Sequence, residues 1–203
     1  MTPTKDKNSS AAKKAVKKKS GTTAKKISSR TDQGLIIVIT GNGKGKTTAA
    51  FGQVLRAIGQ GYKVFIMQFM KGREYGEFMA AEKYLPNVTI RKSGLDSFVM
   101  RDNPAPIDIE LAQKGLAAAR KAIMSGKYEM VVLDEVNVAM DFKLISTKDV
   151  IELIKHRPIS TNLILTGRYA PKEIIRLADT VSDIQDIKHH YHAGVKDRRG
   201  IEY

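Results

Sequence analysis

The chain has 203 residues, a formal net charge of +14 and no cysteine. This length fits one domain with a tail, and the lack of cysteine excludes disulfides, thiolate metal sites and cysteine nucleophiles. No apolar run approaches the roughly 20 residues of a membrane-spanning helix, and the lysine-rich start lacks the apolar stretch of a secretory signal, so we expect a cytoplasmic protein with no membrane partner.

Residues 1–33 form a basic segment with nine lysines and one arginine against two aspartates, which is +8 of the net charge. The segment has almost no large apolar side chains, so burial cannot offset the entropy of ordering, and we predict a disordered tail. A basic arm can bind nucleic acid, but no aromatic residue able to stack on a base interleaves these lysines. We therefore favour a solvated leader, followed by one domain over residues 34–203.

A glycine-rich turn follows the first apolar run of that domain. Residues 35–40 predict a strand and 47–58 a helix, and between them lie Gly41, Asn42, Gly43, Lys44, Gly45, Lys46, Thr47 and Thr48. Glycines allow several backbone N–H groups to converge on an anion, and a helix N-terminus attracts negative charge. Lys46 can reach the outer phosphates of a nucleotide, and the Thr47 hydroxyl can bind Mg²⁺. The segment predicts a phosphate-binding loop, although Thr40 stands where the strict pattern has its first glycine.

Strands and helices alternate through the rest of the domain. We predict strands at 63–69, 87–91, 130–135, 162–166 and 181–187, the last at a sheet edge, and helices at 78–84, 107–125, 146–155 and 171–178. Residues 71–77 indicate a loop. Residues 93–106 indicate a long irregular segment, of a kind that is usually functional or mobile. The alternation predicts an α/β fold in three layers, with a mainly parallel sheet and helices on both faces.

Polar residues follow two of these strands. Asp134 and Glu135 end the strand at 130–135, and Arg168 follows the strand at 162–166. Ligands of parallel sheets bind at the carboxyl ends of the strands, so we expect these residues to lie near the glycine-rich turn. A carboxylate there can hold Mg²⁺ beside Thr47, and an arginine can bind phosphate with two donors.

Three histidines cluster near the end of the chain, at His189, His190 and His192. Imidazoles can bind a transition metal. Adjacent residues of a regular strand, however, point to opposite faces, and no cysteine is available to complete a site. We interpret the segment as polar and not as a metal site.

The domain resembles the ATP:corrinoid adenosyltransferases of cobalamin biosynthesis and salvage. The matching segments cover most of residues 34–203, and the family has its own variant of the loop with a similar start. The matching segments are 39–52, 68–72 (QFMKG), 132–139 (VLDEVNVA), 165–168 (LTGR), 177–182 (LADTVS), 188–189, 193–196 and 200–203 (GIEY).

The resemblance implies a phosphate-loop NTPase fold of the RecA-like type and a reaction in which Co(I) of a corrinoid attacks the 5′ carbon of ATP, releasing triphosphate. Lys46, Glu135 and Arg168 would be catalytic, residues 41–48 would bind ATP, and Thr47 with Glu135, or alternatively Asp134, would hold Mg²⁺ or Mn²⁺. It also implies a homodimer and a reductase or flavin reductant.

The corrinoid side departs from the family pattern. Relatives often carry Gly-Phe-x-Trp after the third strand, whereas residues 94–98 here read GLDSF and the chain has no tryptophan. Leu95 and Phe98 are the candidates for contact with the lower face of the corrin.

Two other functions remain open, an ATPase stimulated by nucleic acid and a small-molecule kinase. The first has mild support from the +6 charge of residues 34–203, and the second would need an arginine-bearing lid, for which residues 93–106 offer Arg101 alone.

Overall fold

The computed structural model describes residues 33–72 and 74–203, so the predicted tail lies, except for residue 33, outside the described residues. Six strands of the described chain form one sheet in the order β3-β2-β4-β5-β1-β6, and all neighbours run parallel. They are β1 (Ile36–Thr40), β2 (Val64–Phe69), β3 (Val88–Ser93), β4 (Met130–Asp134), β5 (Asn162–Thr166) and β6 (Thr180–Asp183). This confirms the predicted α/β fold with a parallel sheet.

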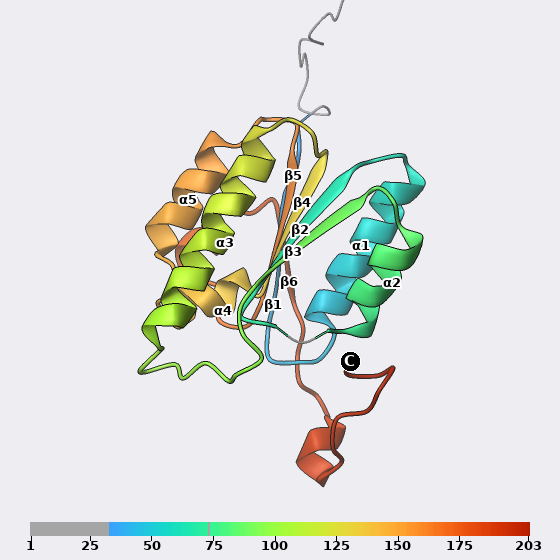
Figure 1. The fold of residues 1–203 in the computed structure, drawn as a ribbon, viewed down its shortest axis with the longest axis vertical. Helices are drawn as coiled ribbons and strands as arrows, with labels where there is room; N and C mark the ends of the chain where they lie inside the picture. The colour runs from blue at the N-terminus through green and yellow to red at the C-terminus, as the bar shows by residue number, and fades with distance from the viewer. Residues whose placement is uncertain (1–32, 73) are drawn as a thin grey trace, which may run out of the picture.

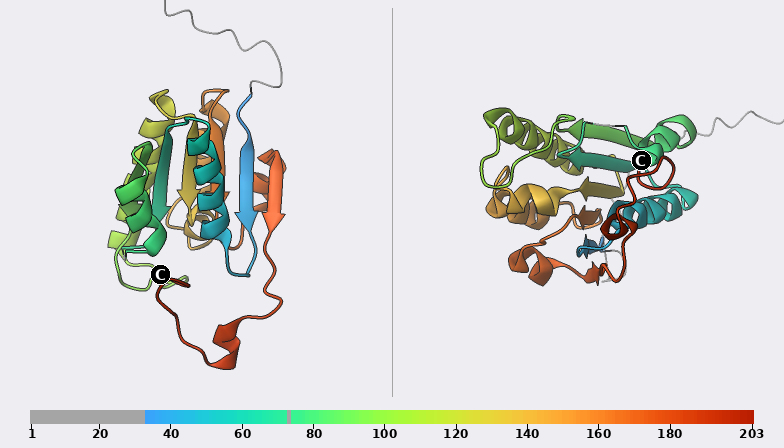
Figure 2. Two further views of the ribbon diagram at one scale, coloured as in Figure 1. Left: turned by 90° about the vertical axis from the view of Figure 1, so that its right-hand side faces the viewer. Right: turned by 90° about the horizontal axis from the view of Figure 1, so that it is seen from below.

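Helices cover both faces of the sheet (Figures 1 and 2). One face carries α1 (Lys46–Gly59) and α2 (Gly76–Tyr84), and the other carries α3 (Pro106–Met124), α4 (Val136–Asp141), α5 (Thr147–His156) and α6 (Lys172–Leu177). The predicted cap of α5 is confirmed, because Ser146 Oγ accepts the backbone N–H of Asp149 at 3.1 Å.

The central strands are apolar because they are covered on both sides. All residues of β2 and β4 are buried, and alternate side chains join different cores. Val131 and Leu133 pack with residues of α3 and α5, whereas Met130 and Val132 pack with residues of α1 and α2. This two-residue alternation explains why the sequence shows continuous apolar runs and not an alternation of apolar and polar residues.

The last strand is shorter than predicted. The sequence predicts residues 181–187, but β6 ends at Asp183. Ile184 then leaves the sheet, and its backbone bonds to the glycine-rich turn: its N–H donates to Thr40 O at 2.9 Å, and its carbonyl accepts from Gly43 at 2.7 Å. The prediction of an edge strand is confirmed. Its predicted end at residue 187 was wrong, because the carbonyl of Ile184 bonds to Gly43 of the glycine-rich turn.

Two short elements were not predicted. One is α4, six residues long, and the other is a 3₁₀ helix, η2 (His190–Ala193). Neither is long enough for a helical pattern to stand out. After β6 the chain passes beneath the carboxyl ends of the strands, as Figure 2 shows, and ends there. No helix in the described part of the chain is both long and apolar enough to cross a membrane.

Candidate active site

The glycine-rich turn has the backbone that its glycines permit. Gly41 has φ 98° and Gly45 has φ 115°, both in the region that L side chains avoid. A Cβ on Gly41 would collide with Asp183 Oδ1 and Ile184 O, and a Cβ on Gly43 would collide with Gln185 O. The loop is therefore clamped between α1 and the segment that follows β6, and it needs glycine for close approach as well as for conformation.

Lys46 begins α1 and lies over the loop. Its Nζ donates to Gly43 O at 2.7 Å, and the residue is buried. Burial lowers the pKa of Lys46, and Glu135 opposes that shift. The ammonium therefore stands at the helix N-terminus, close enough to Glu135 and Asp134 for both carboxylates to influence it.

Asp134 is the carboxylate that contacts Thr47. Its side chain is fully buried, and Oδ1 accepts hydrogen bonds from Thr47 Oγ1 at 3.0 Å and from Thr166 Oγ1 at 2.6 Å. Oδ2 accepts from Gln68 Nε2 at 3.3 Å. The hydroxyl of Thr47 thus donates its hydrogen bond to Asp134, which leaves its oxygen lone pairs for a cation.

Glu135 is held differently. Its backbone has φ 60°, in the left-handed region, and its N–H donates to Thr166 Oγ1 at 3.0 Å. This turn separates its side chain from the strand and starts α4. Burial raises the pKa of Glu135, and Lys71 opposes the shift.

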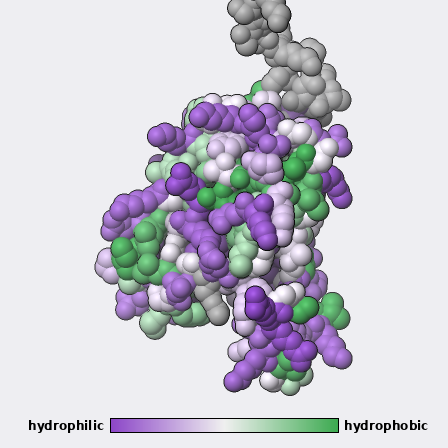
Figure 3. Space-filling view, turned by 45° about the vertical axis from the view of Figure 1, so that its right-hand side comes forward, coloured by the Kyte–Doolittle hydropathy of each residue, from purple (hydrophilic) through white to green (hydrophobic). Residues whose placement is uncertain are grey.

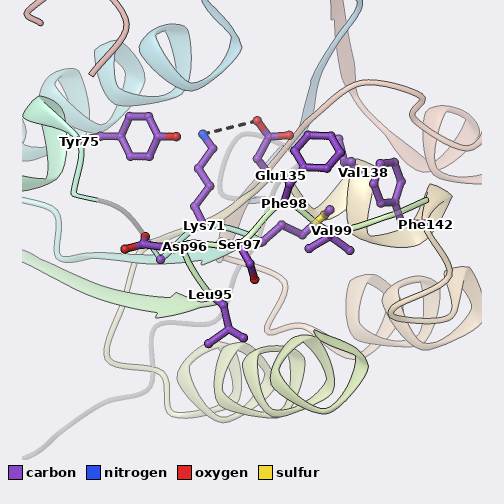
Figure 4. Close-up of a pocket in the computed structure, with 12 residues that line it drawn as sticks. Lys71, Tyr75, Leu95, Asp96, Ser97, Phe98, Val99, Glu135, Val138 and Phe142 are labelled. Carbon is purple, nitrogen blue, oxygen red and sulfur yellow. Dashed lines mark ion pairs between the residues drawn. The ribbon is translucent and has the colours of Figure 1, made fainter. Parts of the chain in front are cut away.

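Lys71 is a site residue for which the sequence predicted no role, although it lies in a predicted loop and in the family-like segment 68–72. Its Nζ lies 3.6 Å from Glu135 Oε1, 3.9 Å from Asp134 Oδ2 and 4.7 Å from the centre of the Tyr75 ring. In Figure 4 the ammonium lies between Tyr75 and Glu135. Burial lowers the pKa of Lys71, but Asp134 and Glu135 raise it more, so the net shift is upward. Its place two residues after the end of β2, at the carboxyl end of a central strand, is the signal that could have identified it.

Three of the cavities in the described structure meet at Glu135. A cavity of about 560 Å³ is lined by residues 44–48, Lys71, Tyr75 and the chain end at 200–203. One of about 310 Å³ is lined mainly by apolar residues, among them Val99, Val138 and Phe142. The third, of about 440 Å³, lies beside Lys46 and Arg168. The phosphate loop, the carboxylate of Glu135 at the end of β4 and Arg168 thus come together, as the sequence predicts.

Phe98 and Leu95, the two residues predicted to contact the corrin, differ in their placement. Phe98 is 92% exposed and lines both the apolar cavity and the cavity of Arg168. Its ring lies beside Glu135, whereas Leu95 points away from the Lys71–Glu135 pair (Figure 4). Leu95 is 41% exposed and lines the apolar cavity only.

The end of the chain contacts the phosphate loop. Lys44 Nζ donates to Ile201 O at 2.6 Å and to Glu202 Oε2 at 2.9 Å. Figure 3 shows the segment after β6 as a largely hydrophilic lobe below the body of the molecule. The contact explains why the final residues belong to the site although they are distant from the loop in sequence.

Comparisons with known proteins agree with this geometry. A family described as ATP:corrinoid adenosyltransferase BtuR/CobO/CobP matches residues 32–203. A corrinoid adenosyltransferase of Sinorhizobium is 35% identical over 189 residues, covering 92% of this chain and 88% of that protein. Corrinoid adenosyltransferases of Escherichia coli K12 and Salmonella typhimurium are each 36% identical over 173 residues, covering 85% of this chain and 87% of those proteins.

Proposed function

Because the chain belongs to the ATP:corrinoid adenosyltransferase family, we propose that its site transfers the 5′-deoxyadenosyl group of ATP to Co(I) of a corrinoid. A bond forms between cobalt and the 5′ carbon, the bond from that carbon to oxygen breaks, and triphosphate leaves with the electron pair. The substrate supplies the nucleophile, so the protein needs neither a nucleophilic side chain nor a general base. Its tasks are to orient the two substrates and to stabilise the departing charge.

One observation carries this proposal: Glu135 lines both the cavity of the phosphate loop and the apolar cavity. A nucleotide whose phosphates occupy the loop can therefore present its ribose carbon toward an apolar surface. That is the arrangement that transfer to a corrin requires, and it differs from transfer to a small polar acceptor.

The polar groups divide the remaining work. Lys46 and the N–H groups at the start of α1 stabilise the leaving triphosphate, since both place positive charge where negative charge develops. Arg168 lines a cavity together with Lys46 and adds a second cation there.

The donors at Thr47 suit a hard cation such as Mg²⁺ or Mn²⁺, which prefers hydroxyl and carboxylate oxygens. Both oxygens of Asp134 already accept hydrogen bonds, so we assign Asp134 to orienting Thr47. Glu135 and Thr47 would hold the ion itself, which when bound neutralises phosphate charge.

We further propose that Phe98 contacts the corrin, that a reductase or reduced flavin supplies the electron for Co(II), and that the chain works as a homodimer. Phe98 is supported by its exposure at the rim of two cavities. Light scattering coupled to gel filtration tests the dimer.

Identification of the phosphate product tests the central proposal. Chemically reduced Co(I) corrinoid and ATP should yield adenosylated corrinoid and inorganic triphosphate in equal amounts. ADP with orthophosphate, rising on addition of nucleic acid, would instead indicate an ATPase. ADP with a phosphorylated acceptor would indicate a kinase.

A further inference from the structure

Three side chains of types that can bind a metal converge at the edge of the site described above, where the chain end meets the phosphate loop. His189 and His190 follow β6, and Glu202 is the second-last residue of the chain. One donor atom from each lies within 4.8 Å of the other two. All three side chains are partly accessible to solvent, so an ion can reach them.

The local backbone allows two adjacent histidines to face the same way. His189 is extended, with φ −132° and ψ 135°, and His190 starts the 3₁₀ helix η2. The chain therefore turns between them, and the ring centres lie 4.6 Å apart with planes inclined by 31°. In a regular strand the two side chains would point to opposite faces. The reason for rejecting a metal site from the sequence does not hold in this structure.

Glu202 offers one oxygen to this cluster. Its Oε2 is bound by Lys44, whereas its Oε1 is shielded from solvent and has no hydrogen-bond partner among the described residues. Oε1 faces His190 Nε2 at 3.3 Å. A shielded carboxylate oxygen needs a donor or a cation, and here either a protonated His190 or an ion bound by both groups can supply it.

We propose that His189, His190 and Glu202 bind one divalent transition-metal ion of the Zn²⁺ class. Two imidazoles and one carboxylate are a ligand set that Zn²⁺ accepts with a fourth position left for water, whereas Mg²⁺ prefers oxygen alone. Donors around a tetrahedral Zn²⁺ stand about 3.4 Å apart, so the side chains must move inward slightly. One contact competes with this, because His189 Nδ1 accepts the Tyr191 N–H at 3.2 Å.

The site would connect the chain end to the nucleotide cavity. Lys44 in the phosphate loop holds Glu202 and Ile201, and His189 and Glu202 both line the cavity of Lys46 and Arg168. An ion at Glu202 would fasten the terminal residues to the segment after β6, and would shield Glu202 from phosphates bound at the loop.

Metal binding without nucleotide tests the proposal. The full chain, stripped with a chelator, is dialysed against Zn²⁺, and retained metal is measured by mass spectrometry; Co²⁺ serves as a spectroscopic probe of imidazole ligation. We expect the unmodified chain to retain one equivalent of Zn²⁺. Binding should be weaker by about tenfold or more in His189→Ala, His190→Ala and Glu202→Gln. Circular dichroism confirms that each variant is folded.

Two controls locate the ion. His156→Ala removes the one histidine outside residues 189–192 and should leave Zn²⁺ binding unchanged, as should Glu135→Gln in the nucleotide site. His192 pairs with Asp186 at 2.9 Å, so loss of binding in His192→Ala but not in His190→Ala would place the ion there and overturn the proposal. Retention of no metal by the unmodified chain would overturn it as well.

Discussion

Replacing Lys71 by methionine tests how much this cation stabilises the fold through its ion pairs with Asp134 and Glu135 at the carboxyl ends of β2 and β4. The variant keeps much of the side-chain volume but leaves Asp134 and Glu135 as adjacent carboxylates. The Lys71 side chain is 21% exposed, that of Glu135 is 20% exposed and that of Asp134 is fully buried. Removing one partner of a buried ion pair costs about 3–5 kcal/mol.

The lower end of that range applies here, because Asp134 keeps its hydrogen bonds from Thr47, Gln68 and Thr166. A loss of about 3 kcal/mol in the free energy of unfolding lowers Tm by about 6–12 °C in a domain of this size. Lys114→Met is the matched control: its pair with Glu110 is exposed on α3, so it should cost less than about 0.5 kcal/mol.

The deficit should also depend on pH. The pKa of Glu135 is already raised by burial, so the native state binds a proton more readily than the unfolded chain, and stability falls as pH rises through that raised pKa. Loss of Lys71 raises the pKa of Glu135 further, so the pH range over which stability falls extends to higher pH. Protonation of Glu135 removes one of the two negative charges. The Tm difference between Lys71→Met and the unmodified chain should therefore be largest near about pH 8 and shrink toward about pH 5.

Lys71 itself stays charged across this range, because its own pKa is raised and its contribution is lost only at alkaline pH. Thermal unfolding followed by circular dichroism at several pH values gives both results. A Tm within about 2 °C of the unmodified chain would refute the electrostatic account. A large deficit that does not change with pH would assign the effect to packing.

Three further predictions concern activity. Lys46→Ala should lower turnover by about a hundredfold or more, as expected for loss of one strong donor to the leaving group, and near-normal triphosphate release would contradict its role. Glu135→Gln should raise the Mg²⁺ concentration for half-maximal activity, while Asp134→Asn should mainly lower the rate; a Mg²⁺ midpoint shifted only in the aspartate variant would reverse the assignment. Phe98→Ala should leave ATP binding unchanged in calorimetry but slow the reaction from Co(II), a defect that pre-reduced Co(I) relieves, and Leu95→Ala, whose side chain points away from Glu135, should be milder.

Local rules account for most of what the sequence predicts correctly. The strands β1, β2, β4 and β5 are mostly apolar because a parallel sheet covered on both faces buries nearly all of their side chains. The phosphate loop is marked by glycines whose φ values other residues avoid and by the Lys46-Thr47 pair at a helix start. Such signals lie within a few residues of each other, so they can be found without the tertiary structure.

The tertiary structure alone decides which of the two carboxylates contacts Thr47. Asp134 and Glu135 are neighbours and chemically alike, and only the left-handed backbone at Glu135 turns the second away from the strand. The same holds for Lys71, whose two carboxylate partners are 63 or more residues distant in sequence and meet it because β2 and β4 are adjacent in the sheet.

The end of the chain shows the same division. Its composition indicates a polar segment, and nothing in the order of its residues predicts that Glu202 meets Lys44 or His190. Those contacts exist because Ile184 leaves the sheet to bond the phosphate loop, which directs the remaining residues beneath the carboxyl ends of the strands. Sequence determines which side chains a segment carries, whereas long-range packing determines which of them meet, because contacts between distant residues depend on the path of the whole chain.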